Sequence, residues 1–149
     1  MKKPAKSKKR TSITSFNYNT VESKLFLEKG VDPVEIDGTI LRRKYICDNN
    51  DNQIYLSVTT VGNVVLGDTQ YKLDDEWHSI TDDERQILGT NNELDGKKLK
   101  ISRTVSGEAG TPCTVSLWLE GGYRDIVNRL SAEVEDNNSI TFMMYIEFI

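Results

Sequence analysis

The chain has 149 residues, a formal net charge of -4, and 37% hydrophobic against 28% charged residues. This length suits one domain, and the compact apolar runs exclude a disordered chain. No stretch approaches the ~20 apolar residues of a membrane span, and positions 1–12 lack the apolar run of a secretory signal. We therefore expect no membrane partner, and a location in a virion if the protein is viral or in the cytoplasm otherwise.

The first twelve residues, MKKPAKSKKRTS, predict an extended basic arm. Pro4 and the mutual repulsion of the lysines oppose a helix there. Its positive side chains are Lys2, Lys3, Lys6, Lys8, Lys9 and Arg10. Without these six, residues 11–149 hold 13 basic and 23 acidic side chains. The arm should therefore reach a separate anionic partner or an acidic protein surface.

Residues 13–149 predict a single domain built from strands, because apolar and polar positions alternate along them. IDG (36–38) predicts a turn. The runs ILRRKYIC (40–47) and QIYLSVTTVG (53–62), joined by the turn-forming DNNDN, predict a hairpin with one solvated face. Residues 63–68 predict a short strand or bulge, and 71–73 predict another short strand.

Two segments predict helices. In TDDERQILG (81–89), Thr81 and Glu84 fit a capping box, and Gly89 stands where a C-cap belongs. In 123–135 the apolar residues recur at a helical spacing. They are Tyr123, Ile126, Val127, Leu130 and Val134.

Further strands are predicted at 97–105, 113–122 and 139–149. In the first, one face holds Leu99, Ile101, Arg103 and Val105. Strands this short and this regularly spaced predict a mainly β fold, an antiparallel β-sandwich of jelly-roll or immunoglobulin-like type. We expect it to carry one or two short helices and the extended N-terminal arm. The helices are too few for the crossovers that a parallel α/β sheet needs.

The final strand has two contrasting faces. One carries Ile140, Phe142, Met144, Ile146 and Phe148 and should line the core. The other carries Thr141, Met143, Tyr145, Glu147 and Ile149. Three of these, Met143, Tyr145 and Ile149, make it too apolar for water. We expect the predicted helix at 123–135 or another chain to cover it, so these three form a candidate contact face.

Residues suited to catalysis or metal binding are sparse. Cys47 and Cys113 lie far apart and predict two thiols in strands rather than a disulfide. His78 is the one histidine, and no nucleophile elbow accompanies it. One histidine and two distant cysteines do not make a zinc site. We expect no enzyme activity, no cofactor and no metal.

Six carboxylates lie within residues 74–84: Asp74, Asp75, Glu76, Asp82, Asp83 and Glu84. They do not fit a calcium-binding loop. We interpret them as a solvated surface with helix capping, or as an acidic docking surface for the basic arm of a neighbouring copy.

The leading hypothesis is a non-enzymatic structural or accessory subunit of a large assembly, anchored by its basic arm. Its partners would be other protein subunits, including copies of itself. Analogy at the level of the fold favours a phage virion protein, such as a capsid decoration, head–tail or tail component. One alternative is a nucleic-acid-associated module whose arm binds phosphate. Another is a carbohydrate- or ligand-binding sandwich that stacks its ligand on Trp77, Trp118 and Tyr123.

Overall fold

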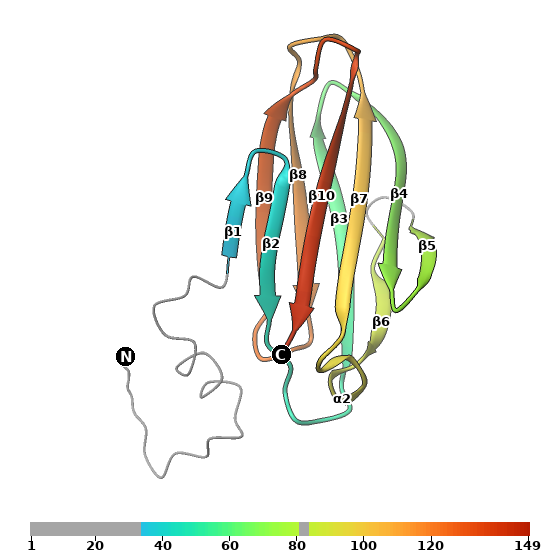
Figure 1. Ribbon diagram of the computed structural model, residues 1–149, viewed down its shortest axis with the longest axis vertical. Coiled ribbons are helices and arrows are strands. Elements are labelled where there is room, and N and C mark those ends of the chain that lie inside the picture. Colours follow the sequence, from blue (N-terminus) through green and yellow to red (C-terminus); the bar gives the residue numbers. More distant parts are fainter. Residues whose placement is uncertain (1–33, 81–83) are drawn as a thin grey trace, which may run out of the picture. The chain divides into compact units, whose positions relative to one another are not determined.

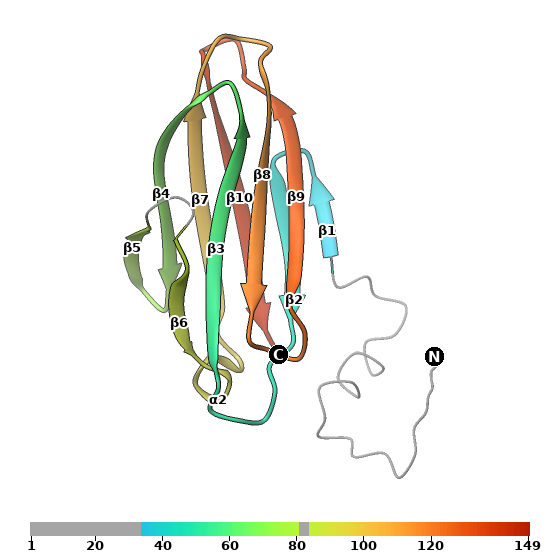
Figure 2. The same cartoon turned by 180° about the vertical axis from the view of Figure 1, so that it is seen from behind.

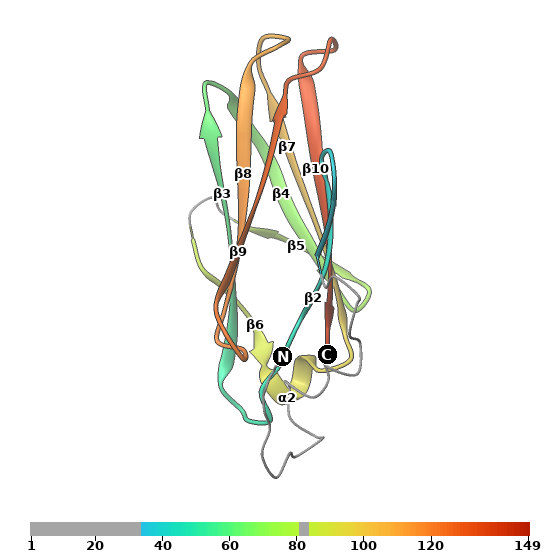
Figure 3. The same ribbon diagram turned by 90° about the vertical axis from the view of Figure 1, so that its left-hand side faces the viewer.

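The computed structural model describes residues 34–80 and 84–149, which form two facing β-sheets (Figures 1 and 3). In spatial order, the six-stranded sheet contains β1 (Val34–Asp37), β2 (Ile40–Tyr45), β10 (Ser139–Phe148), β7 (Lys98–Ser106), β4 (Val65–Leu73) and β5 (Glu76–Ile80). The four-stranded sheet, which faces the viewer in Figure 2, contains β6 (Gln86–Thr90), β3 (Gln53–Gly62), β8 (Pro112–Glu120) and β9 (Ile126–Glu133). The fold is the predicted mainly β sandwich. The basic arm lies outside the described residues.

The core lies between the two sheets and follows the alternation of the strands. Leu56 and Val58 of β3 and Leu117 of β8 face Phe142 and Met144 of β10, and each is at most 1% exposed. Fully burying a side chain of this kind contributes roughly 1.5–3 kcal/mol. The apolar alternation read from the sequence is therefore the main source of the sandwich's stability.

Neighbouring strands in the described residues run antiparallel, except for β2 and β10, which run parallel. In that pair Ile40 lies opposite Met143, and Tyr45 lies opposite Phe148. The last strand of the chain thus lies between β2 and β7. The predicted bulge in 63–68 is present, because the pairing of β4 with β7 shifts register between Leu66 and Thr69.

The predicted hairpin of 40–47 with 53–62 is wrong, because β2 and β3 belong to different sheets. The DNNDN loop crosses between the sheets and packs against α2 (Asn91–Leu94). Asn91 donates from its backbone N and from Nδ2 to the Asn52 carbonyl, and its Oδ1 accepts from Asp48 N at 2.8 Å. Turn residues indicate that the chain reverses, but they do not tell whether it stays in one sheet.

Both helices predicted from the sequence are wrong where the structure describes them, and Thr81 of the predicted capping box lies outside the described residues. Residues 86–90 form β6 and residues 126–133 form β9. Ile126, Leu130 and Val134 recur every four residues, a spacing that also fits the two-residue period of a strand. Pairing with β8 then favours the strand. Within 34–80 and 84–149 the helix is α2, and it has its own capping box, in which Thr90 Oγ1 accepts from Glu93 N and Glu93 Oε1 accepts from Thr90 N.

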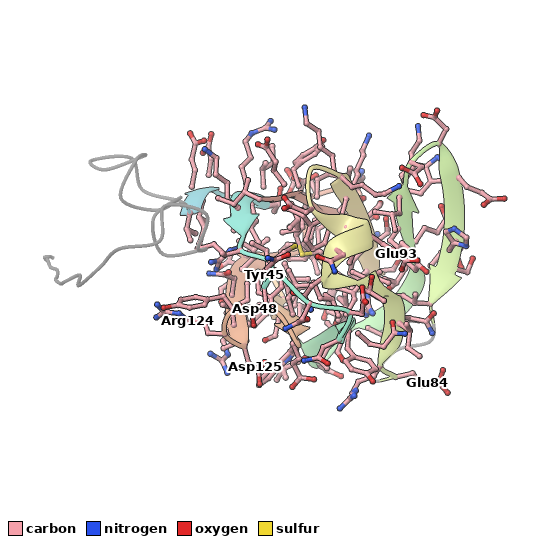
Figure 4. All side chains as sticks on the ribbon, turned by 90° about the horizontal axis from the view of Figure 1, so that it is seen from below. Tyr45, Asp48, Glu84, Glu93, Arg124 and Asp125 are labelled. Atoms are coloured by element: carbon pink, nitrogen blue, oxygen red, sulfur yellow. The ribbon has the colours of Figure 1, made fainter. Side chains whose placement is uncertain are left out.

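Tyr45 at the end of β2 holds the turn between β8 and β9 in place. Its ring is 2% exposed. Its hydroxyl accepts from Gly122 N at 2.9 Å and donates to the Arg124 carbonyl at 2.9 Å. Asp125 Oδ1 accepts from Gly121 N at 3.1 Å in the same turn. Figure 4 shows Tyr45, Arg124 and Asp125 at this end of the sandwich.

Stability should fall as the pH rises from about 10 to about 12. Burial raises the pKa of Tyr45 to about 12, whereas a tyrosine of the unfolded chain titrates near 10. Above pH 10 the folded chain therefore keeps a proton that the unfolded chain loses. The stabilisation is fully present below pH 10 and decreases by about 3 kcal/mol as the pH passes the folded pKa.

Urea unfolding between pH 8 and pH 12 would measure this decrease. Tyr45→Phe should be less stable at pH 8, by about 1–3 kcal/mol, because it loses two buried hydrogen bonds. Its loss of stability above pH 10 should be smaller than that of the native chain. Part of the decrease should remain, since burial also raises the pKa of Tyr71. An equally steep decrease in Tyr45→Phe would contradict the prediction.

Candidate functional site

A row of side chains crosses the outer face of the six-stranded sheet from one edge to the other. Strand register places the residues opposite one another in sequence, from β1 through β2, β10, β7 and β4 to β5. Arg42, Tyr145, Lys100 and Lys72 stand on the side of the sheet opposite the core, because each has a buried neighbour in its strand. Trp77 lies on the same side, since Lys72 and Lys100 both approach its ring, and Glu35 pairs with Arg42 across β1 and β2. We call these six residues the outer row: Glu35, Arg42, Tyr145, Lys100, Lys72 and Trp77.

Cations flank both aromatic rings of the outer row. The Arg42 Cζ lies 4.6 Å from the centroid of the Tyr145 ring, and the Lys100 Nζ lies 5.7 Å from it. The Lys72 and Lys100 Nζ atoms each lie 5.8 Å from the Trp77 centroid. Each such contact contributes about 0.5–1 kcal/mol at an exposed site. Lys100 contacts both rings and so makes the row continuous.

Two further rows flank the outer row on the same face. One is mostly neutral and runs through Ile40, Met143, Ser102, Gln70 and Ser79. The other is charged and runs through Lys44, Glu147 and Lys98. Figure 4, which looks along the strands, shows nitrogen-tipped side chains projecting from the outer side of this sheet.

The net charge of this face is opposite in sign to the net charge of residues 11–149. Its basic side chains are Arg42, Lys44, Lys72, Lys98 and Lys100. Its acidic side chains are Glu35, Asp37, Glu147 and the exposed Asp68, which precedes the buried Thr69 on β4. The face is thus net positive, although residues 11–149 are strongly acidic. Charge of one sign gathered on one face raises the local concentration of ligands of the opposite sign.

The apolar contact residues predicted from the last strand lie on this face. Met143, Tyr145 and Ile149 are all half-buried on the outer side of the six-stranded sheet. The helix that was expected to cover them does not form, since residues 126–133 are β9 of the other sheet. Arg42 and Lys100 instead flank the Tyr145 ring.

The acidic residues predicted as a docking surface do not form one cluster in the described residues. Asp74 and Asp75 lie in the turn before β5 and Glu76 begins that strand, whereas Glu84 follows its other end. Asp74 accepts from Lys97 Nζ at 3.1 Å, and Glu76 lies 3.8 Å from His78 Nε2. Asp82 and Asp83 lie outside the described residues. Within 34–80 and 84–149, no group of three or more His, Cys, Asp or Glu side chains is placed to hold a metal ion.

His78 is exposed but packs one side of its ring on a tyrosine, whereas both cysteines are buried. The His78 ring stacks on Tyr71 at a centroid distance of 4.9 Å on the core side of β5. Cys47 and Cys113 are buried as separate thiols, as predicted, although Cys47 lies just after β2 rather than in it. Burial raises the pKa of the Cys113 thiol, which disfavours the reactive thiolate.

The aromatic residues of the ligand-binding hypothesis do not form one platform. Trp77 lies on the outer face of the six-stranded sheet, whereas Trp118 lies on the outer face of the four-stranded sheet. Trp118 does point outward, as predicted, and its Nε1 donates to Thr59 Oγ1 at 3.4 Å. Tyr123 lies in the turn after β8, with the Arg124 Cζ 5.3 Å from its ring centroid.

The search for related proteins gives no match among protein family models, curated proteins or solved structures. The part of the chain that the structure describes contains no helix long and apolar enough to cross a membrane.

Sequence reasoning missed Arg42, Lys72 and Lys100 as members of a site. Each belongs to a strand that carries basic residues at outward positions, in ILRRKYIC, YKL and KKLKISRTV. That signal was visible in each strand separately. Its meaning depends on strand order, which places the three cations beside Tyr145 and Trp77.

Proposed function

We propose that the protein is a non-enzymatic structural or accessory subunit of a larger assembly. The outer face of the six-stranded sheet is the surface through which it contacts a macromolecular partner. The observation that supports this proposal is the outer row, a continuous series of aromatic and basic side chains on a broad sheet. Trp, Tyr, Arg and Met are enriched at the centres of protein–protein interfaces, and aromatic side chains beside cations also bind single-stranded nucleic acid. This face presents Trp77, Tyr145, Arg42 and Met143 together.

The place of the outer row within the sheet supports a binding role. Tyr145 and Lys100 stand on central strands, and both rings of the row already contact neighbouring cations. Side chains that are ordered before a partner arrives lose less conformational entropy on binding. The basic arm would act as a second contact, because a cationic segment speeds and orients association with an anionic surface. The virion setting is supported by fold-level analogy alone.

Size-exclusion chromatography with light scattering would test the proposal on the full chain, at low and high salt, alone and with a single-stranded oligonucleotide. The Trp77→Ala/Tyr145→Ala double variant should lose the oligomer or complex that the native chain forms. Trp118→Ala removes an equally large ring from the opposite sheet and should leave it intact. A variant lacking residues 2–10 measures how much the arm contributes to formation of the oligomer or complex. If the native chain remains a monomer in every condition, the proposed function is wrong.

A further inference from the structure

We propose that the outer row binds single-stranded nucleic acid, with bases stacked on Tyr145 and Trp77 and phosphates paired with Arg42, Lys100 and Lys72. This inference rests on the proposed function and names the partner of its contact face. Nucleic-acid binding was expected from the basic arm alone, whereas here the folded sheet supplies the site.

The charges of the face fit a polyanion. The outer row carries three basic side chains and one acidic one, Glu35 on the edge strand β1, so the row is net positive in a chain whose residues 11–149 are net acidic. Lysine is depleted at the centres of protein–protein interfaces. Here Lys100 and Lys72 are neighbours in the middle of the face, on β7 and β4. Two adjacent lysines repel each other until an anion lies between them, so the arrangement favours a phosphate backbone over a protein partner.

The two aromatic rings supply stacking surfaces for bases, which cations alone cannot provide. Base–aromatic stacking tolerates any sequence, because every base has a π-face. Tyr145 on β10 and Trp77 on β5 are three strand spacings apart, about 14 Å at about 4.8 Å for each spacing. The whole row spans about 24 Å on the same basis. Lys100 lies between the two rings and contacts both, so a strand of nucleic acid that stacks on both rings passes over a cation.

The breadth of the face distinguishes single strands from duplexes. The major groove of DNA admits a helix or a two-stranded ribbon, and a six-stranded face is too broad to enter it. In a duplex the faces of the bases are also covered by their neighbours and cannot reach Tyr145 or Trp77. The structure therefore favours unpaired bases.

Fluorescence anisotropy with a labelled oligothymidylate of about 20 nucleotides would test the inference on the full chain. Trp77→Ala and Tyr145→Ala should each weaken binding by about tenfold, and at high as well as low salt, because stacking does not depend on counterions. Tyr145→Phe should bind like the native chain, and Trp118→Ala is the matched control on the opposite sheet. Lys100→Gln should reduce the slope of log affinity against log salt by about 0.7.

Three results would overturn the inference. The first is binding that survives both alanine variants but is lost when the six arm cations are replaced by serine, since the arm would then be the site. The second is equal affinity for the oligonucleotide and for its duplex. The third is no binding at low salt. If the native chain then still forms an oligomer that the Trp77→Ala/Tyr145→Ala variant loses, the inference fails while the proposed function stands.

Discussion

Gly121→Ala should lose more than about 4 kcal/mol of the free energy of unfolding, the largest effect that we expect from adding one methyl group. Gly121 follows β8 with a φ of +99°, where side chains other than glycine's are strained. An added Cβ would also lie 2.1 Å from the Gln53 carbonyl oxygen. That oxygen belongs to the backbone of β3 and cannot swing aside as a flexible side chain would.

The turn cannot relieve the clash by moving, because it is held on several sides. The Gly121 carbonyl accepts from Asn91 Nδ2 at 2.9 Å, and its N donates to Asp125 Oδ1. The next residue, Gly122, donates to the Tyr45 hydroxyl. We expect a loss of more than about 4 kcal/mol, which is exceptional for one substitution and comparable with the roughly 5–15 kcal/mol of a whole domain.

Gly96→Ala is the matched control. Its φ is +92°, and no atom lies within 4 Å of the position that a Cβ would occupy. It carries the left-handed strain alone, about 1–2 kcal/mol, and should still fold. Circular dichroism during urea unfolding would compare the two variants. If both lose the same free energy of unfolding, the clash with Gln53 is not what makes Gly121 necessary.

The direction of side chains could be predicted from the sequence, because it depends on a local period of two. Trp118 points outward between Leu117 and Leu119, and Tyr145 points outward between two buried residues of β10. The same period placed Arg103 on the inner side of β7 with the apolar residues. In each case the alternation of residues within a single strand is enough to predict the side to which the side chain points.

Which strands are neighbours could not be predicted in this way. The outer row joins Glu35 to residues as distant in the chain as Tyr145, and it exists only because β10 lies between β2 and β7. Strand order depends on the packing of the whole sandwich, and turn residues do not determine it. The misassigned hairpin at DNNDN has the same cause. The misassigned helix at 123–135 reflects a spacing of four residues, which helices and strands both satisfy.

The second substitution for which we expect a large loss of stability removes the buried Arg103 side chain. Its side chain is 0% exposed in the core, and its Nη1 donates to Thr60 Oγ1 at 2.6 Å. Hydrogen bonds to a charged group contribute about 1.5–3 kcal/mol, because a buried charge that loses an acceptor keeps its full desolvation cost. Arg103→Ala should lose about 3–5 kcal/mol, since it also leaves a cavity. Arg103→Met fills most of that space and should lose less.

A double-mutant cycle would isolate the contribution of the Arg103–Thr60 bond to stability. Thr60→Val keeps the shape of the side chain but removes the acceptor, so it should cost about 1–3 kcal/mol in the native chain. In the Arg103→Met background no guanidinium is left to satisfy, so the same substitution should cost close to nothing. Urea unfolding of the four proteins gives the coupling energy. Equal costs in both backgrounds would show that Thr60 does not stabilise the buried charge, and that the acceptors that matter to Arg103 lie elsewhere around it.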